Sequence, residues 1–143
     1  MKNVYNIDYP SWTAEDVIFY HREMWNWIAD ESLRLKRKVD KSEYFDAMEI
    51  LHEPENRCYL CEYDLHHGKS LCDSCLVDWK HCGDVRSSEW DSICHRSMCM
   101  HKYDYDYMNI YARWYHVNYD YKKAAELAYI IANLPIRKDV DIV

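Results

Sequence analysis

The stretch TAEDVIFYHREMWNWIADESLRLKRK, residues 13–38, predicts the longest helix of the chain. Thr13 and Asp16 stand at capping-box spacing at its start, with Asp in the place of the usual Glu. Apolar side chains and one histidine then recur at steps of three and four, which places them on one helix face. These residues are Val17, His21, Met24, Trp25, Ile28 and Leu35. We therefore expect a helix that starts at Ser11 or Thr13 and ends near Lys38.

The composition extends this prediction to the whole chain. A chain of 143 residues, 49% of them hydrophobic, is long enough for one domain with one core. Only two glycines and three prolines occur, which disfavours the many turns of an all-β fold. The fold class that we expect is mainly α.

Further helices are predicted on both sides of the middle of the chain. Asp40 and Glu43 stand at capping-box spacing before a short helix over about Lys41 to Leu51, and Pro54 follows it. The chain is helical again from about Tyr103.

Asp120 can cap a final helix, which Pro135 ends. We expect a single domain over residues 1–143. Its parts are N-terminal helices (1–56), a zinc-binding insert (57–82), a loop (83–102) and C-terminal helices (103–143).

The segment CYLCEYDLHHGKSLCDSC, residues 58–75, holds two C-x-x-C pairs that ten residues separate. Their cysteines are Cys58, Cys61, Cys72 and Cys75. Two such pairs supply the four thiolates that tetrahedral Zn²⁺ accepts, and a closed shell of this kind stabilises a fold without catalysing. Because residues 66–69 offer a turn with a glycine, we expect a central zinc-knuckle hairpin. Paired or free thiols and an iron site are the alternatives.

The other three cysteines are also close to histidines. They are Cys82, Cys94 and Cys99, beside His81, His95 and His101. Mixed shells of cysteine and histidine bind zinc, so these residues can form a second site, or Cys82 can replace one member of the first set. Alternatively, the cysteines pack as small buried hydrophobes.

The charge of the chain limits its partners and its location. A formal net charge of −7 disfavours direct nucleic-acid binding, which usually needs a basic excess, and suits a basic partner protein. The sequence shows neither a secretory signal nor an apolar run of about 18 residues, so we expect a cytoplasmic protein without a membrane segment. Residues 34–38 are the basic exception, as a solvated helix end or as a patch for an acidic surface.

Catalytic motifs are scarce. The zinc deaminase, H-E-x-x-H metalloprotease and P-loop patterns are all missing. His66 and His67 lie between the C-x-x-C pairs, as a catalytic histidine does in ββα-metal nucleases, but the ten-residue gap leaves little room for that site. A hydrolase that pairs Cys94 with His95 or His101 stays open. The sequence favours a non-enzymatic protein.

Fourteen tyrosines and six tryptophans offer binding surface. Seven of the tyrosines gather late in the chain, at 103, 105, 107, 111, 115, 119 and 121. They either pack in the core and its boundary or form a partner-binding face, with Asp104, Asp106 and Asp120 supplying negative charge.

The segments HREMWNWIADES, NRCYLCEYD, CDSCLVDW and KAAELAYIIANLP together resemble small, uncharacterised zinc-binding proteins of bacteriophages that infect Gram-positive hosts. The resemblance covers most of the chain and implies a helix, knuckle, helix order, but no activity. In that context an acidic accessory protein is expected to inhibit or modulate a host defence system from the host cytoplasm.

Our leading hypothesis is a non-enzymatic, zinc-stabilised interaction module that binds a host or phage protein. An alternative is a sponge for a nucleotide ligand, which stacks on aromatic rings while Arg or Lys of residues 34–41, or Arg86, meets phosphate. The zinc-stapled nuclease is the third hypothesis.

Overall fold

The computed structural model describes residues 7–54, 57–67, 76–77 and 110–136. The elements of this part are η1 (Tyr9–Ser11), α1 (Ala14–Leu35), α2 (Lys41–Ala47), α3 (Tyr59–His66), α5 (Ile110–His116) and α6 (Tyr121–Ala132). Its only β-type pairing is an isolated antiparallel bridge between Val77 and Ile136. The mainly helical prediction is thus confirmed for the described residues.

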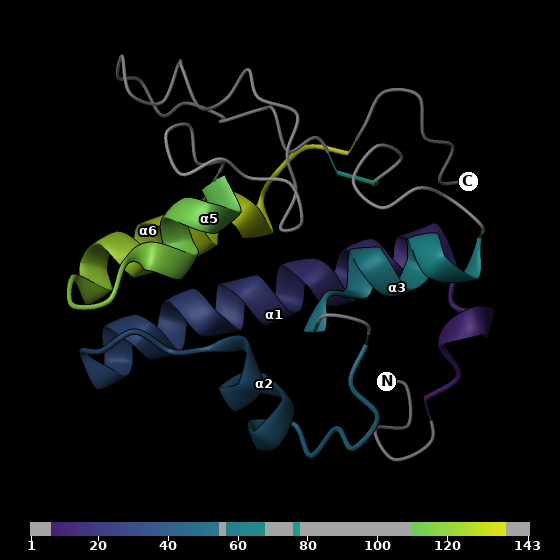
Figure 1. The fold of residues 1–143 in the computed structure, drawn as a ribbon, viewed down its shortest axis with the longest axis horizontal. Helices are drawn as coiled ribbons and strands as arrows, with labels where there is room; N and C mark the ends of the chain where they lie inside the picture. The colour runs from purple at the N-terminus through teal and green to yellow at the C-terminus, as the bar shows by residue number, and fades with distance from the viewer. Residues whose placement is uncertain (1–6, 55–56, 68–75, 78–109, 137–143) are drawn as a thin grey trace.

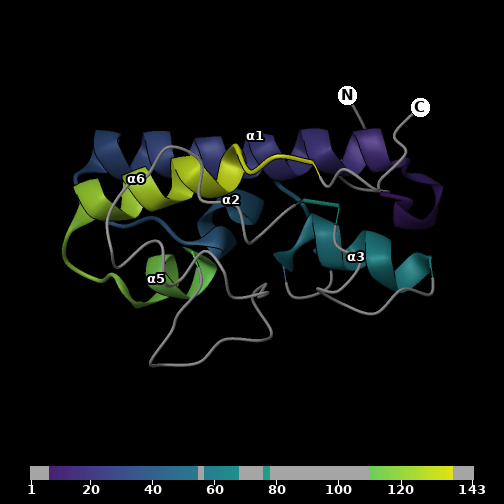
Figure 2. The same cartoon turned by 90° about the horizontal axis from the view of Figure 1, so that it is seen from above.

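Helix α1 is the axis on which the other helices pack. Figures 1 and 2 show α6 lying antiparallel beside it, with α3 along its first half and α2 and α5 near its second half. The pairing of α1 with α6 is the most extensive, and α1 also contacts α2 and α3. His21 Nε2 lies 3.1 Å from the Ile131 carbonyl oxygen, and the Tyr129 hydroxyl donates to the Asp30 carboxylate. The core is therefore formed between two helices, α1 and α6, that are far apart in the sequence.

The start of α1 follows the expected capping box. The Thr13 hydroxyl accepts from the Asp16 amide at 3.1 Å, and the Asp16 carboxylate accepts from the Thr13 amide at 3.0 Å. The predicted stripe is buried from Val17 to Ile28, whereas Leu35 is 41% exposed and lies outside it. The helix ends at Leu35, before the expected Lys38, because Lys36 adopts the left-handed conformation with φ 56° and ψ 40°.

The ends of the other helices also report on the local signals. Helix α2 begins at Lys41 as predicted but ends at Ala47, four residues before Leu51, and Glu49 follows with a φ of 57°. Helix α6 is capped by Asp120, whose carboxylate accepts from the Lys123 amide at 3.0 Å, and it ends before Pro135 as predicted. The helix start expected near Tyr103 falls outside the described residues. Within them, α5 covers Ile110–His116.

An aromatic cluster joins η1, α1 and α3. The ring of Trp12 stacks on Tyr20 at 4.6 Å and on Tyr59 at 5.5 Å between centroids. Tyr9 is buried as well, and its hydroxyl donates to the His52 carbonyl oxygen. Tyr9 and Trp12 therefore anchor the segment just before α1 in the core.

Within the described segments, every helix is too short or too polar to span a lipid bilayer.

Candidate metal centre and flanking pockets

The first C-x-x-C pair opens helix α3. Cys58 directly precedes the helix, and its sulfur accepts a hydrogen bond from the Cys61 amide at 3.3 Å, as an N-cap oxygen would. Tyr59 and Leu60, between the cysteines, are each 1% exposed and hold this end of α3 in the core. Both cysteines are buried, and no disulfide joins them to each other. Two soft ligands are therefore presented on a fixed piece of backbone.

The surroundings favour the thiolate form. The hydrogen bond with Cys61 lowers the pKa of Cys58, the nearby positive charge of Lys41 acts in the same direction, and desolvation opposes both. Burial lowers the pKa of Lys41 to about 8, while its interaction with Cys58 and Cys61 raises it. A cation beside these sulfurs suits a zinc tetrathiolate, since four thiolates outweigh the charge of the ion.

The second pair, Cys72 and Cys75, lies outside the described residues, as does the cluster around Cys82, Cys94 and Cys99. Among residues 7–54, 57–67, 76–77 and 110–136, no group of three or more potential metal ligands comes together. In the first half of the hairpin expected over 58–75, the structure has a helix: residues 59–66 form α3. The burial of Tyr59 and Leu60 is the physical reason for this difference.

The two histidines of the nuclease hypothesis lie at the end of α3. The Nε2 atom of His66 contacts the carboxylate of the buried Glu62. His67 stacks on Tyr63 with 3.9 Å between ring centroids, and its Nδ1 lies 2.9 Å from the Tyr63 carbonyl oxygen. Both histidines therefore make local contacts at a helix end, and the nuclease hypothesis stays a prediction.

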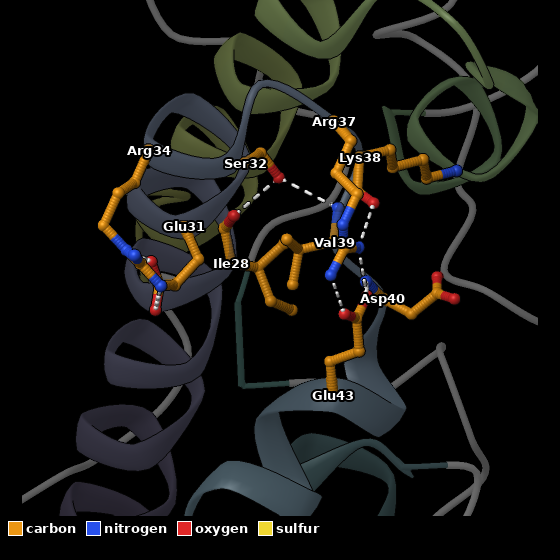
Figure 3. Close-up of polar contacts among 9 residues, drawn as sticks. All are labelled: Ile28, Glu31, Ser32, Arg34, Arg37, Lys38, Val39, Asp40 and Glu43. Carbon is orange, nitrogen blue, oxygen red and sulfur yellow. Dashed lines mark hydrogen bonds and ion pairs between the residues drawn. The ribbon is translucent and has the colours of Figure 1, made fainter.

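The basic run at the end of α1 is used inside the protein (Figure 3). Arg34 pairs with Glu31, and Arg37 bonds both oxygens of Glu43 at 2.6 and 3.1 Å. Lys38 extends away from the Arg37 pair and donates to two carbonyl oxygens at the end of α5, at 2.7 and 2.8 Å. The helix-end interpretation therefore explains most of this run.

An acidic aromatic pocket lies beside the first half of α1. We use this name for a cavity of about 650 Å³ lined by Ile7, Trp12, Asp16, Phe19, Tyr20, Glu23, Tyr44, Met48, Ile50 and Tyr59. Trp12, Tyr44 and Tyr59 of this lining are buried, whereas Phe19 is 59% exposed. Two carboxylates, Asp16 and Glu23, are the charged groups of the lining. The pocket is thus apolar within and negative at its edge.

A basic aromatic pocket lies beside α5. This cavity of about 570 Å³ is lined by Lys38, Asp40, Lys41, Ser42, Arg57, Tyr111, Trp114, Tyr115, His116 and Asn118. The ammonium of Lys38 is 4.4 Å from the Trp114 ring centroid, and that of Lys41 is 4.9 Å from the Tyr111 ring centroid. The pocket therefore combines cations with ring faces, beside the cysteines of α3.

The late tyrosine cluster divides in the structure. Tyr111 is buried, Tyr115 is 55% exposed, and Tyr119 is 98% exposed. Residues 103–107 lie outside the described part, and so do Asp104 and Asp106. The acidic aromatic surface that the structure does show is at the other end of the chain, around Phe19 and Glu23, where sequence reasoning assigned no site.

Comparison with protein-family models, with curated proteins and with solved structures found no match to this chain.

Proposed function

We propose that this chain is a non-enzymatic, zinc-stabilised interaction module that binds a basic, partly apolar segment of a partner protein. The acidic aromatic pocket is the observation that carries this proposal. Its volume falls within the roughly 300–1,000 Å³ that is typical of ligand sites. Such a cavity accepts one or two large side chains of a protein segment.

The lining determines the chemistry of the segment. Trp12, Tyr20 and Phe19 offer ring faces and apolar area, which suit an aromatic or aliphatic anchor or the stem of an arginine. The Glu23 carboxylate on α1 is exposed at the edge, where it can meet a guanidinium or an ammonium. The net charge of −7 attracts the same partners over longer distances.

Zinc supports this function through the fold. In our proposal Cys58, Cys61, Cys72 and Cys75 hold one Zn²⁺ and fix the start of α3. Tyr59 lies between the first two cysteines and lines the pocket. The metal would therefore hold a wall of the binding site in place.

The resemblance to phage proteins suggests the biological setting. A small acidic protein made in the host cytoplasm can occupy the basic surface of a host protein, and we propose an inhibitor or modulator of a host defence system. The target is a protein and not a nucleic acid, because the chain repels phosphates overall.

Calorimetry with synthetic peptides tests the proposal. The probe is a twelve-residue peptide in which arginine alternates with tryptophan or leucine, and its counterpart carries glutamate in place of arginine. We expect the basic peptide to bind and the acidic one not to bind. Glu23→Lys should weaken binding by at least about tenfold, which corresponds to about 1.4 kcal/mol for a charge-assisted contact.

The matched control is Glu126→Lys, which reverses an exposed charge on α6 outside the pocket. It should leave the affinity within about twofold. Equal loss with both variants would reduce the effect to net charge, and equal binding of both peptides would contradict the proposal. The unchanged protein, Glu23→Lys and Glu126→Lys can then each be used as bait in a pull-down experiment. The natural partner is the protein that binds the unchanged chain and Glu126→Lys but does not bind Glu23→Lys.

A further inference from the structure

We infer that the acidic aromatic pocket is one end of a binding groove along α1, and that the partner segment enters this groove as a basic, amphipathic helix. The inference rests on the proposed function and adds the form of the segment and the position of its cation. In complexes of this kind, apolar side chains on successive turns of the partner helix anchor it in the groove.

Three side chains of α1 give the groove its direction. Phe19, Glu23 and Trp27 follow one another at steps of four, so they lie on one face of the helix on successive turns. Phe19 is 59% exposed, Glu23 is exposed, and Trp27 is half-buried. With a rise of 1.5 Å per residue, this face is about 12 Å long. It therefore has room for more than one side chain of a partner.

The opposite side of the groove comes from α2. Tyr44 lies on this helix, Met48 is its C-cap residue, and both line the acidic aromatic pocket. The rings of Trp27 and Tyr44 meet edge to face, with 5.6 Å between their centroids. This contact extends the aromatic surface of the pocket along α1, past Glu23, as far as Trp27.

The groove suits a helix better than an extended peptide. An extended peptide needs partners for its backbone amides and carbonyls, which the edge of a sheet supplies. The described segments contain no strand, and their one β-type pairing is the bridge between Val77 and Ile136. The lining of the pocket is mostly apolar or aromatic and offers backbone groups few partners. A helix satisfies its own backbone, and its side chains recur at steps that match those along α1.

Glu23 determines the charge of the helix. Its exposed carboxylate stands between two aromatic side chains of α1 and forms no ion pair within the described segments. Its negative potential reaches the pocket: burial raises the pKa of the Tyr44 hydroxyl to about 12, and the charge of Glu23 adds to this rise. The complementary pattern is an arginine or lysine with large apolar side chains three or four residues away on the partner helix.

Two peptides of equal composition test the form of the segment by calorimetry. Both have twelve residues, half arginine and half leucine. One alternates the two residues, and the other places its leucines at steps of three and four, which makes it amphipathic as a helix. We expect the second peptide to bind at least about tenfold more tightly and to gain helical circular dichroism on binding.

The outcomes separate this inference from the proposed function. Equal affinity of the two peptides, or binding of the second without a gain in helix, overturns the inference and leaves the proposed function intact. If neither peptide binds, the proposed function fails and the inference fails with it.

Variants along α1 locate the segment. Phe19→Ala removes a mostly exposed side chain, so it should fold, and it should weaken binding of the helical peptide by at least about fivefold. Trp27→Ala should do the same, but should change the affinity of the alternating peptide, which reaches only the pocket, by less than about twofold. The control is Leu35→Ala, which removes an exposed apolar side chain of α1 outside the pocket and should leave both affinities unchanged. Unchanged binding of the helical peptide in Phe19→Ala and Trp27→Ala, or an equal loss in Leu35→Ala, refutes the groove.

Discussion

At the scale of single residues, the core of this protein contains polar side chains that are held by specific backbone partners. His21 is fully buried on α1, with Nε2 facing the Ile131 carbonyl oxygen of α6. Ser32, also buried, donates to the Ile28 carbonyl oxygen at 2.7 Å and accepts from the Val39 amide at 3.1 Å. Polar groups in such positions fix one geometry, because their partners would be left unsatisfied in any other.

His21 makes stability depend on pH. Burial lowers its pKa from 6.5 to about 4. Between pH 6.5 and pH 4, His21 is therefore protonated in the unfolded chain but neutral in the folded one. The free energy of unfolding consequently falls as the pH decreases through this range, and it levels off near pH 4. Urea unfolding at pH 7 and pH 5 should show a loss of about 2 kcal/mol from this residue. The variant His21→Gln, which keeps a donor for Ile131, should lack that part of the loss, and an equal loss in both proteins would contradict the assignment.

At the scale of elements, the end of α1 and the start of α2 form one hydrogen-bonded unit (Figure 3). The amides of Lys36 and Arg37 both donate to the Ser32 carbonyl oxygen. On the other side of the turn, the Glu43 carboxylate accepts from the Asp40 amide at 2.8 Å and pairs with Arg37. The turn between the two helices is thus determined by side chains at both of its ends.

Ser32→Ala tests this unit. It removes the acceptor of the Val39 amide and leaves a buried donor without a partner, so we expect a loss of about 1–3 kcal/mol in the free energy of unfolding. The control is Ser11→Ala, which removes an exposed hydroxyl bonded to the Asp8 carbonyl oxygen and should cost less than about 0.5 kcal/mol. Equal unfolding free energies for the two variants would show that the turn is held by other contacts.

Local signals explain which elements the sequence could predict. The caps at Thr13 and Asp120 act over three residues, and both helices that they start are found where the pattern places them. Helix α3 was missed, since its cause is the burial of Tyr59 against Trp12 and Tyr20, about forty residues earlier in the chain. The end of α1 at Leu35 could not be predicted, because no glycine stands at position 36. Hydrogen bonds to the Ser32 carbonyl oxygen and the turn that follows hold Lys36 in the left-handed conformation instead.

The candidate sites were predictable to a different extent. The spacing of Cys58 and Cys61 needs no tertiary knowledge, and the structure indeed brings these two sulfurs to one helix end. Both pockets join residues from three or four segments, such as Lys38, Arg57 and Trp114, which no local period connects. Their chemistry becomes visible only when the helices pack.

At the scale of the whole molecule, metal binding is expected to contribute to folding. Native mass spectrometry should find one zinc ion per chain, lost with a chelator and in the variant Cys61→Ser but retained in Cys99→Ser. If free zinc exceeds the dissociation constant by about 1,000-fold, the ion adds about 4 kcal/mol to stability, so chelation should lower the unfolding temperature. Two ions would add the cluster of Cys82, Cys94 and Cys99, while no ion, or a mass that matches a disulfide, would contradict the zinc site.

The antiparallel pairing of α1 with α6 also decides when the protein can fold during its synthesis. His21 and Ile131 are 110 residues apart, so a ribosome that adds about 5–20 residues per second needs roughly 5–20 seconds to deliver the partner of α1. Throughout that delay the apolar face with Trp25 and Ile28 is open to chaperones and proteases. A nascent chain that stalls before α6 keeps this face uncovered, so survival of the product depends on its last described helix.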